Sequence, residues 1–148
     1  MKKYSLKQLI LLLLQVGDNH LSISSTNYGE YYEVVKAPDV LYPHMFLEII
    51  SSITSTPNLN TFNIAIQFID RSLEDISTRI DTQDALFQIA ETYLQKLSID
   101  TLLFDYEFLN YNVLLYQEKY VDRVYVCRVE FDIIMPRRIN SCNLPFDK

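Results

Sequence analysis

The strongest constraint on the fold is a strict alternation of apolar and polar residues near the C-terminal end of the chain. The apolar members of this alternation are Tyr125, Cys127, Val129, Phe131 and Ile133. The charged residues between them are Arg128, Glu130 and Asp132. Successive side chains of a strand point to opposite faces of a sheet, so this pattern predicts one face in the core and one in water. Such a half-exposed strand is typical of an antiparallel sheet, and Pro136 is expected to end it.

A second alternating segment lies in the middle of the chain. Phe62, Ile64, Ile66 and Phe68 alternate there with Asn63, Ala65, Gln67 and Ile69. The apolar run Leu41–Ile50 precedes it, and the intervening segment Ser51–Thr61 is rich in turn-forming residues. We therefore expect an antiparallel hairpin with a long connection. The aromatic and aliphatic stretch Phe108–Tyr116, followed by a polar tip over 117–122, predicts a second pair with the C-terminal strand.

The N-terminal segment Met1–Val16 admits two interpretations. It begins with two lysines near its start and contains an apolar run, as a secretory signal peptide does. That run is too short to span a bilayer, which needs about 20 residues, and the residues after it offer little of a cleavage-site pattern. We interpret the segment as a buried helix that Ser5 caps and that Gly17–Asn19 ends. The residues predicted on its main apolar face are Leu6, Leu9, Ile10, Leu13 and Leu14.

A central amphipathic helix is predicted over Asp81–Leu97. Asp81 can cap its start, and Asp84 places a negative charge in the first turn, which the helix dipole favours. The predicted buried face consists of Leu86, Ile89, Ala90, Tyr93, Leu94 and Leu97. The segment Asp70–Ile80 before it is charged and irregular, so we expect a connection there. The order helix, strand pair, helix, strand pair predicts an α+β fold, with a mainly antiparallel sheet flanked by the N-terminal and central helices.

A single domain of residues 1–148 is expected, because this length fits one core and no linker or repeat divides the chain. Residues 20–39 are polar and rich in tyrosine, which predicts an extended arm, and residues 137–148 form a polar tail. The chain has 11 Tyr, and a tyrosine side chain suits subunit contacts because it joins an apolar ring to a polar tip. The candidate subunit-interface residues are Tyr28, Tyr31, Tyr32, Pro57, Arg137, Arg138 and Phe146.

No catalytic constellation is visible in the sequence. The chain has only two glycines, so a glycine-rich nucleotide loop cannot be assembled. His20 and His44 stand apart, and with Cys127 and Cys142 they do not form a zinc pattern. Cys127 is expected to pack as a small apolar side chain. We therefore expect no catalytic residue, no metal and no cofactor, and a small enzyme that uses His44 and Cys127 is kept as an alternative.

The order of these segments resembles that of small virion proteins of tailed bacteriophages. The resemblance is carried by Leu41–Glu48 (LYPHMFLE), by the strand Phe62–Asp70 and by the helix Asp81–Leu97. A closing strand that runs into Met135–Pro136, followed by a polar tail with a late cysteine, extends it to the C-terminal end. Most of the chain is covered. Within this group the chain is similar to tail-terminator and neck-ring (head–tail connector) proteins, including those of crAss-like phages.

This resemblance implies a structural virion protein whose copies form a closed homo-oligomeric ring of about six or twelve subunits. Such a ring joins the portal or head to the tail, or caps the tail tube. It contacts neighbouring portal, neck or tail proteins and no membrane, and it is assembled in the cytoplasm of the host bacterium. DNA passes through its lumen without sequence-specific binding. A net charge of −6 agrees with that role, because an acidic chain lacks the positive surface that binds phosphates.

A reading from a different functional class follows from the first residues. If Met1–Val16 is a signal peptide, the chain is a secreted or periplasmic small binding module. Whether Met1–Val16 is removed from the mature protein distinguishes this alternative from the buried helix.

Overall fold

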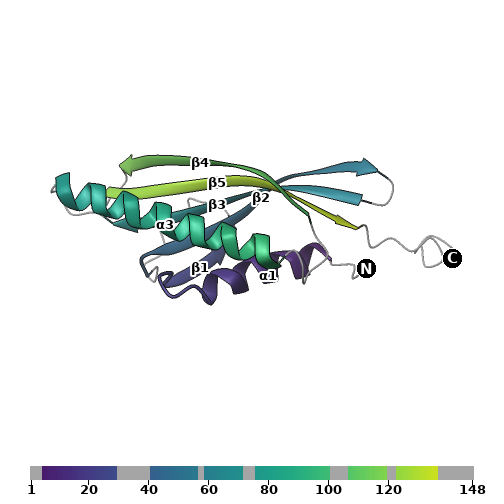
Figure 1. Ribbon diagram of the computed structural model, residues 1–148, viewed down its shortest axis with the longest axis horizontal. Coiled ribbons are helices and arrows are strands. Elements are labelled where there is room, and N and C mark those ends of the chain that lie inside the picture. Colours follow the sequence, from purple (N-terminus) through teal and green to yellow (C-terminus); the bar gives the residue numbers. More distant parts are fainter. Residues whose placement is uncertain are drawn as a thin grey trace.

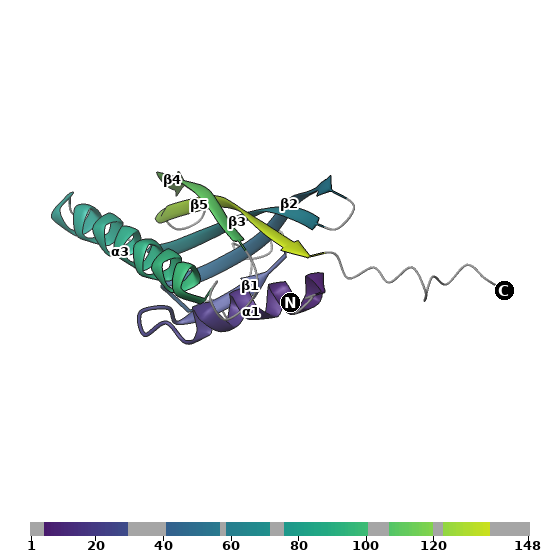
Figure 2. The same ribbon diagram turned by 45° about the vertical axis from the view of Figure 1, so that its right-hand side comes forward.

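The computed structural model describes residues 5–29, 41–56, 59–71, 76–100, 107–119 and 123–136. Within these residues the helices are α1 (Leu6–Asp18) and α3 (Ile76–Asp100). The strands are β1 (Ser25–Tyr28), β2 (His44–Thr56), β3 (Leu59–Arg71), β4 (Glu107–Lys119) and β5 (Arg123–Pro136). They form one sheet in the order β1-β2-β3-β5-β4, with both helices on the same face (Figures 1 and 2). All strand pairs are antiparallel except β1 with β2, so the predicted α+β fold is confirmed.

The last strand of the chain lies inside the sheet. β5 pairs with β3 on one side and with β4 on the other, and both pairs are antiparallel. β3 and β4 therefore run in the same direction, and α3 lies between them in the chain. A crossover between strands of the same direction places its helix on a face of the sheet. This topology puts α3 over the sheet and leaves β4 at the edge (Figure 1).

α1 begins where the sequence predicts. The Ser5 hydroxyl accepts a hydrogen bond from the Gln8 N–H at 3.2 Å, and the Gln8 side chain accepts one from the Ser5 N–H at 2.8 Å. This reciprocal arrangement is a capping box, which satisfies two backbone donors that have no partner inside the helix. Of the predicted face, Leu9 and Leu13 are buried, and the residues Ile10 and Leu14 are partly buried. Leu6, in contrast, is 43% exposed in the first turn.

α1 ends within the predicted segment Gly17–Asn19, but Gly17 itself lies inside the helix and has a packing role. α1 continues through Asp18, and Asn19 caps it in a right-handed conformation. A Cβ atom at position 17 would lie 2.6 Å from Cε and 2.7 Å from Sδ of Met45, and 3.1 Å from Cγ2 of Thr26. The missing side chain therefore lets α1 approach β1 and β2 closely.

The connection between β2 and β3 is much shorter than predicted. β2 continues to Thr56 and β3 begins at Leu59, so most of Ser51–Thr61 is strand and not a long loop. The pairing has irregularities between Ile49 and Ser51 and between Ile53 and Thr56. Ser and Thr accept strand geometry here because each strand supplies a hydrogen-bonding ladder to the other, which outweighs local turn preference. The hairpin end extends past the end of α3 (Figure 1).

α3 is also longer than predicted. It begins at Ile76, so Asp81 is an interior residue and not the N-terminal cap. Near the start of α3, the Thr82 hydroxyl donates a hydrogen bond to the Thr78 carbonyl at 2.8 Å. Thr82 therefore uses its side chain within the helix, where the sequence suggested a boundary. The predicted apolar face is confirmed: Leu86, Ile89, Ala90, Tyr93, Leu94 and Leu97 are all buried.

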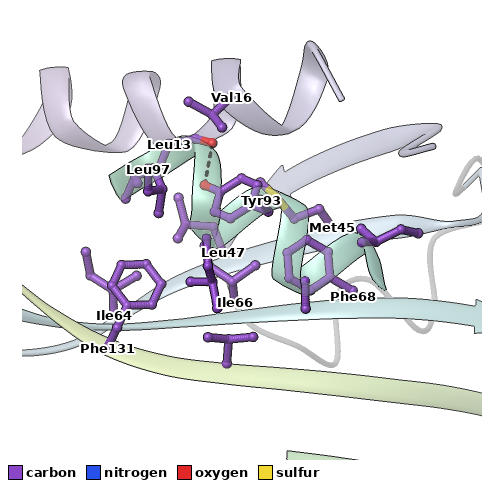
Figure 3. Packing of buried hydrophobic residues seen from close by; sticks show 14 of the residues in the cluster. Leu13, Val16, Met45, Leu47, Ile64, Ile66, Phe68, Tyr93, Leu97 and Phe131 are labelled. Carbon is purple, nitrogen blue, oxygen red and sulfur yellow. Dashed lines mark hydrogen bonds between the residues drawn. The ribbon is translucent and has the colours of Figure 1, made fainter. Parts of the chain in front are cut away.

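Tyr93 joins both helices to the sheet (Figure 3). Its hydroxyl donates to the Leu13 carbonyl of α1 at 2.8 Å, and its ring meets Phe68 of β3 edge-on, with the centroids 5.5 Å apart. The side chain is fully buried, so this bond supplies the partner that a buried tyrosine hydroxyl needs. Leu47 of β2 and Phe131 of β5 face the same cluster. Tyr93 is thus the point at which all layers of the core meet.

The face of the sheet opposite the helices is partly buried as well. A second apolar cluster there consists of Phe46, Ile69, Val124 and Val126. The side of β5 that was predicted to face solvent is half-buried at Arg128, Glu130 and Asp132. The first residues on that side of β5 are buried and belong to this second cluster.

Candidate subunit interface

β4 is an edge strand of the sheet (Figure 1). β5 pairs with one side of it, and none of the other described strands pairs with it. The sequence of β4 has neither a charged residue nor a proline from Phe108 to Gln117. Edge strands usually carry charges or prolines, or are very short, which prevents them from pairing with other chains. The long uncharged edge of β4 is therefore suited to pairing with a further strand.

Two leucines on β4 are exposed on opposite faces of the sheet. Leu114 is 50% exposed and Leu115 is 47% exposed. Leu115 pairs with Cys127 on the side that the helices cover, and Leu114 pairs with Arg128 and points to the other side. A strand that paired with β4 would remove apolar surface of both leucines from water.

A second open edge lies on β2. β1 pairs only with His44–Leu47, and no described strand pairs with the outer edge of β2 beyond Leu47. This part of β2 has no charged residue from Ile49 to Thr56. Ile50, at an irregularity of the pairing with β3, is 46% exposed. The described sheet therefore has two long open edges, on β4 and on the second half of β2.

Of the interface residues predicted from the sequence, the structure describes Tyr28 alone. It ends β1 and is 43% exposed, close to the open part of β2. Tyr31, Tyr32, Pro57, Arg137, Arg138 and Phe146 lie outside the described residues. The leucines of β4 and Ile50 were not selected, because apolar residues in a strand are normally assigned to the core. The available signal was the lack of charge from Phe108 to Gln117 in β4.

A cavity of about 620 Å³ lies between the C-terminal part of α1, the turn after it and α3. Leu12 and Val16 give it apolar walls, and Gln15, Asn19 and Lys96 give it polar ones. Its volume is within the range of small-ligand pockets, which is about 300–1,000 Å³. His20 also lines this cavity.

His20 is held in one tautomer at this cavity. Its Nδ1 accepts a hydrogen bond from the Ser22 N–H at 3.1 Å, so the proton is on Nε2, which lies 2.6 Å from the Thr92 hydroxyl. The Thr92 hydroxyl in turn donates a shared hydrogen bond to two carbonyls of α3, that of Gln88 at 2.9 Å and that of Ile89 at 3.0 Å. Both ring nitrogens are thus engaged, and burial lowers the pKa of His20. The side chain links the turn after α1 to α3.

His44 is buried at the start of β2, and its Nδ1 lies 2.6 Å from the Ser25 hydroxyl. This hydroxyl donates to the Leu41 carbonyl at 2.6 Å, and it accepts from the Leu41 N–H at 3.2 Å. A hydroxyl has one hydrogen, so Nδ1 must donate to Ser25. In a catalytic pair the serine donates to the imidazole, which is the opposite direction. Burial also lowers the pKa of His44 to about 4, so the ring is neutral at pH 7.

The Cys127 side chain is a free thiol in the core. It faces the helices on β5 and has no exposed surface. Burial raises the pKa of this thiol to about 12. Because the thiolate is the reactive form of cysteine, Cys127 contributes apolar packing in the folded chain and not a nucleophile.

An ion-pair network lies on the face opposite the helices. Arg128 of β5 bonds Glu48 at 3.1 Å and Glu130 at 2.9 Å. The pairing places Glu48, Ala65 and Glu130 in one row across β2, β3 and β5. The Arg128 side chain must cross β3 to reach Glu48, and the small Ala65 leaves room for it. The network connects three strands beside the apolar cluster of this face.

The described residues contain no group of three or more His, Cys, Asp or Glu side chains that is placed to hold a metal ion. Neither α1 nor α3 is long and apolar enough to cross a membrane. Comparison of the sequence with protein-family models and with curated proteins finds no match.

Proposed function

We propose that this protein is a structural subunit whose copies assemble into a closed ring in the neck or tail of a tailed bacteriophage. The observation that carries the proposal is the open edge of β4, which is long, uncharged over its centre and carries two half-exposed leucines. A protein that worked as a monomer would leave this edge available to any strand it met. An edge of this kind is instead expected in a chain whose partner is always present.

The position of the ring is proposed from the similarity to tail-terminator and neck-ring proteins. At that position the ring would join the portal or head to the tail and contact the neighbouring portal, neck or tail proteins. The net charge of −6 supports a lumen through which DNA passes without being held, because like charges disfavour contact with phosphates. In this proposal the protein has no catalytic role, and its place is the virion.

The packing of α1 favours this proposal over a secreted binding module. Leu9, Leu13 and Val16 are buried in the core, and the Leu13 carbonyl accepts the hydrogen bond of Tyr93. Removal of residues 1–16 as a signal peptide would uncover that core. Mass spectrometry of the purified protein should therefore detect an N-terminus that retains α1, and a chain that begins after Val16 would support the binding module instead.

Light scattering across a concentration series tests the assembly. We expect a defined multiple of the 17.4 kDa chain for the natural sequence. The double variant Leu114→Lys, Leu115→Lys should shift to the monomer mass, because charges on an edge prevent strand pairing. The matched control is Ile80→Lys, Ile99→Lys, which adds the same charge at two exposed apolar positions of α3 and should keep the oligomer.

Circular dichroism and thermal unfolding must show that both double variants are folded. A natural chain that is monomeric at every concentration would contradict the proposal. An oligomer that persists in the folded β4 variant would contradict the role of the β4 edge.

A further inference from the structure

We propose that neighbouring subunits join by antiparallel pairing of β4 of one copy with the open part of β2, Glu48–Thr56, of the next copy. This inference rests on the proposed ring, and it names the two surfaces that form the contact. It makes the sheets of all subunits continuous around the ring.

The first step concerns symmetry. A ring that joins two different neighbours has two different ends, and it is built from head-to-tail contacts in which each copy contributes two unlike surfaces. The described sheet offers two such surfaces, the outer edge of β4 and the outer edge of β2 beyond Leu47. They lie at opposite edges of the same sheet. When β4 of one copy pairs with β2 of the next, the β2 edge of the first copy and the β4 edge of the second stay free for further copies.

The second step concerns strand direction. β2 is antiparallel to β3, β3 to β5, and β5 to β4, so β2 and β4 run in opposite directions. Rotation about a ring axis preserves the direction of each strand relative to that axis. β4 of one copy therefore meets β2 of the next copy as an antiparallel pair, which is slightly more stable per residue than a parallel pair.

The third step concerns length and register. The uncharged parts of the two edges, Phe108–Gln117 and Ile49–Thr56, are similar in length, and about 26 Å of strand can pair at about 3.3 Å per residue. The pairings within the sheet place Val113 level with Leu47, where β1 begins to cover β2. Full pairing therefore needs β4 to shift toward the β2–β3 hairpin of the next copy. Such a stagger tilts the strands, as closed sheets require.

The fourth step concerns the side chains that the contact would cover. Leu114 and Leu115 on β4 and Ile50 on β2 are each about half exposed, at 50%, 47% and 46%. The proposed pairing brings apolar surface from both edges together in one contact. A contact of β4 with β4 of a second copy is the competing arrangement, but its two-fold symmetry closes at a dimer.

Disulfide trapping tests the contact in the full-length chain. The background variant carries Cys142→Ser, while the buried Cys127 is retained. Ile50→Cys is combined in turn with Asn112→Cys, Leu114→Cys and Leu115→Cys, because a disulfide needs Cα atoms within about 7 Å and the stagger selects one pair. The matched control combines Ile50→Cys with Glu91→Cys, an exposed position of α3. Mild oxidation is followed by electrophoresis without reductant and by light scattering.

We expect at least one β2–β4 pair to give a ladder of covalent multimers that ends at the ring size, while each single variant and the Glu91 control stay uncrosslinked. Covalent dimers from Leu114→Cys alone, without a ladder from any pair, would overturn the inference in favour of β4–β4 pairing. A defined oligomer in light scattering without a ladder from any pair would overturn it while the proposed ring stands. A monomer at every concentration would overturn the proposed function itself, and the inference with it.

Discussion

The contact of Gly17 with Met45 makes a prediction whose sign depends on tertiary packing. In an exposed helix, Gly→Ala stabilises by about 1 kcal/mol. At position 17 the added Cβ lies 2.6 Å from Cε and 2.7 Å from Sδ of Met45. Met45 has no exposed surface, so its terminal atoms have no solvent to move into, and overpacking of this kind costs about 1–3 kcal/mol. We therefore expect Gly17→Ala to lower the free energy of unfolding by a net of about 1 kcal/mol.

Urea and thermal unfolding measure this effect, at one protein concentration because assembly also stabilises the folded chain. A loss of 1 kcal/mol corresponds to a fall of about 3 °C in Tm for a domain of this length. Met45→Ala removes the obstructing atoms, at an expected cost of its own of about 2–5 kcal/mol. In that background Gly17→Ala should become stabilising, since only the helix preference is left. Equal effects of Gly17→Ala in both backgrounds would refute the reasoning.

Three further predictions follow from buried polar and sulfur groups. Tyr93→Phe removes the hydrogen bond to Leu13 and keeps the ring, so unfolding experiments should show a loss of about 1 kcal/mol. The folded pKa of His44, about 4, is below the ordinary histidine value of 6.5, so the unfolded chain binds more protons at this side chain between these values. Stability should thus fall as pH falls from 6.5 toward 4, by about 3 kcal/mol more than in His44→Leu, and equal pH profiles of the two chains would contradict this. Iodoacetamide at pH 8 should leave Cys127 unmodified in the folded Cys142→Ser chain and label it in urea, as mass spectrometry detects.

Residue spacing alone was sufficient to predict the elements that repeat one local pattern. The six apolar positions of α3, the helix-facing side of β5 and the Ser5 cap were all identified this way. These features depend on residues a few positions apart, which the sequence displays directly.

Element boundaries were predicted less well, because partners far away in the chain decide them. Ser51–Thr61 has turn composition, yet β2 and β3 extend through most of it by pairing with each other. Asp81 has the chemistry of a cap, yet the helix begins at Ile76. The end of α1 was predicted correctly within Gly17–Asn19, but the close contact of Gly17 with Met45 was not.

The candidate interface depends on strand order, which no local pattern contains. Phe108–Tyr116 was recognised as a strand from its aromatic and aliphatic residues. Its place at the edge follows from the insertion of β5 between β3 and β4. The same leucines would be core residues in a central strand, and at the edge Leu114 and Leu115 are half exposed.

The sequence by itself determined the fold class, the two amphipathic helices and the buried faces of β3 and β5. The physical reason is that side-chain direction repeats with a fixed period along a helix or a strand, so apolar spacing reports burial. Only the tertiary structure decided which strands lie at the edges, how closely α1 approaches β2, and which way the hydrogen bonds of His20 and His44 run. These properties arise from contacts between segments far apart in the chain, which form only when the helices pack on the assembled sheet.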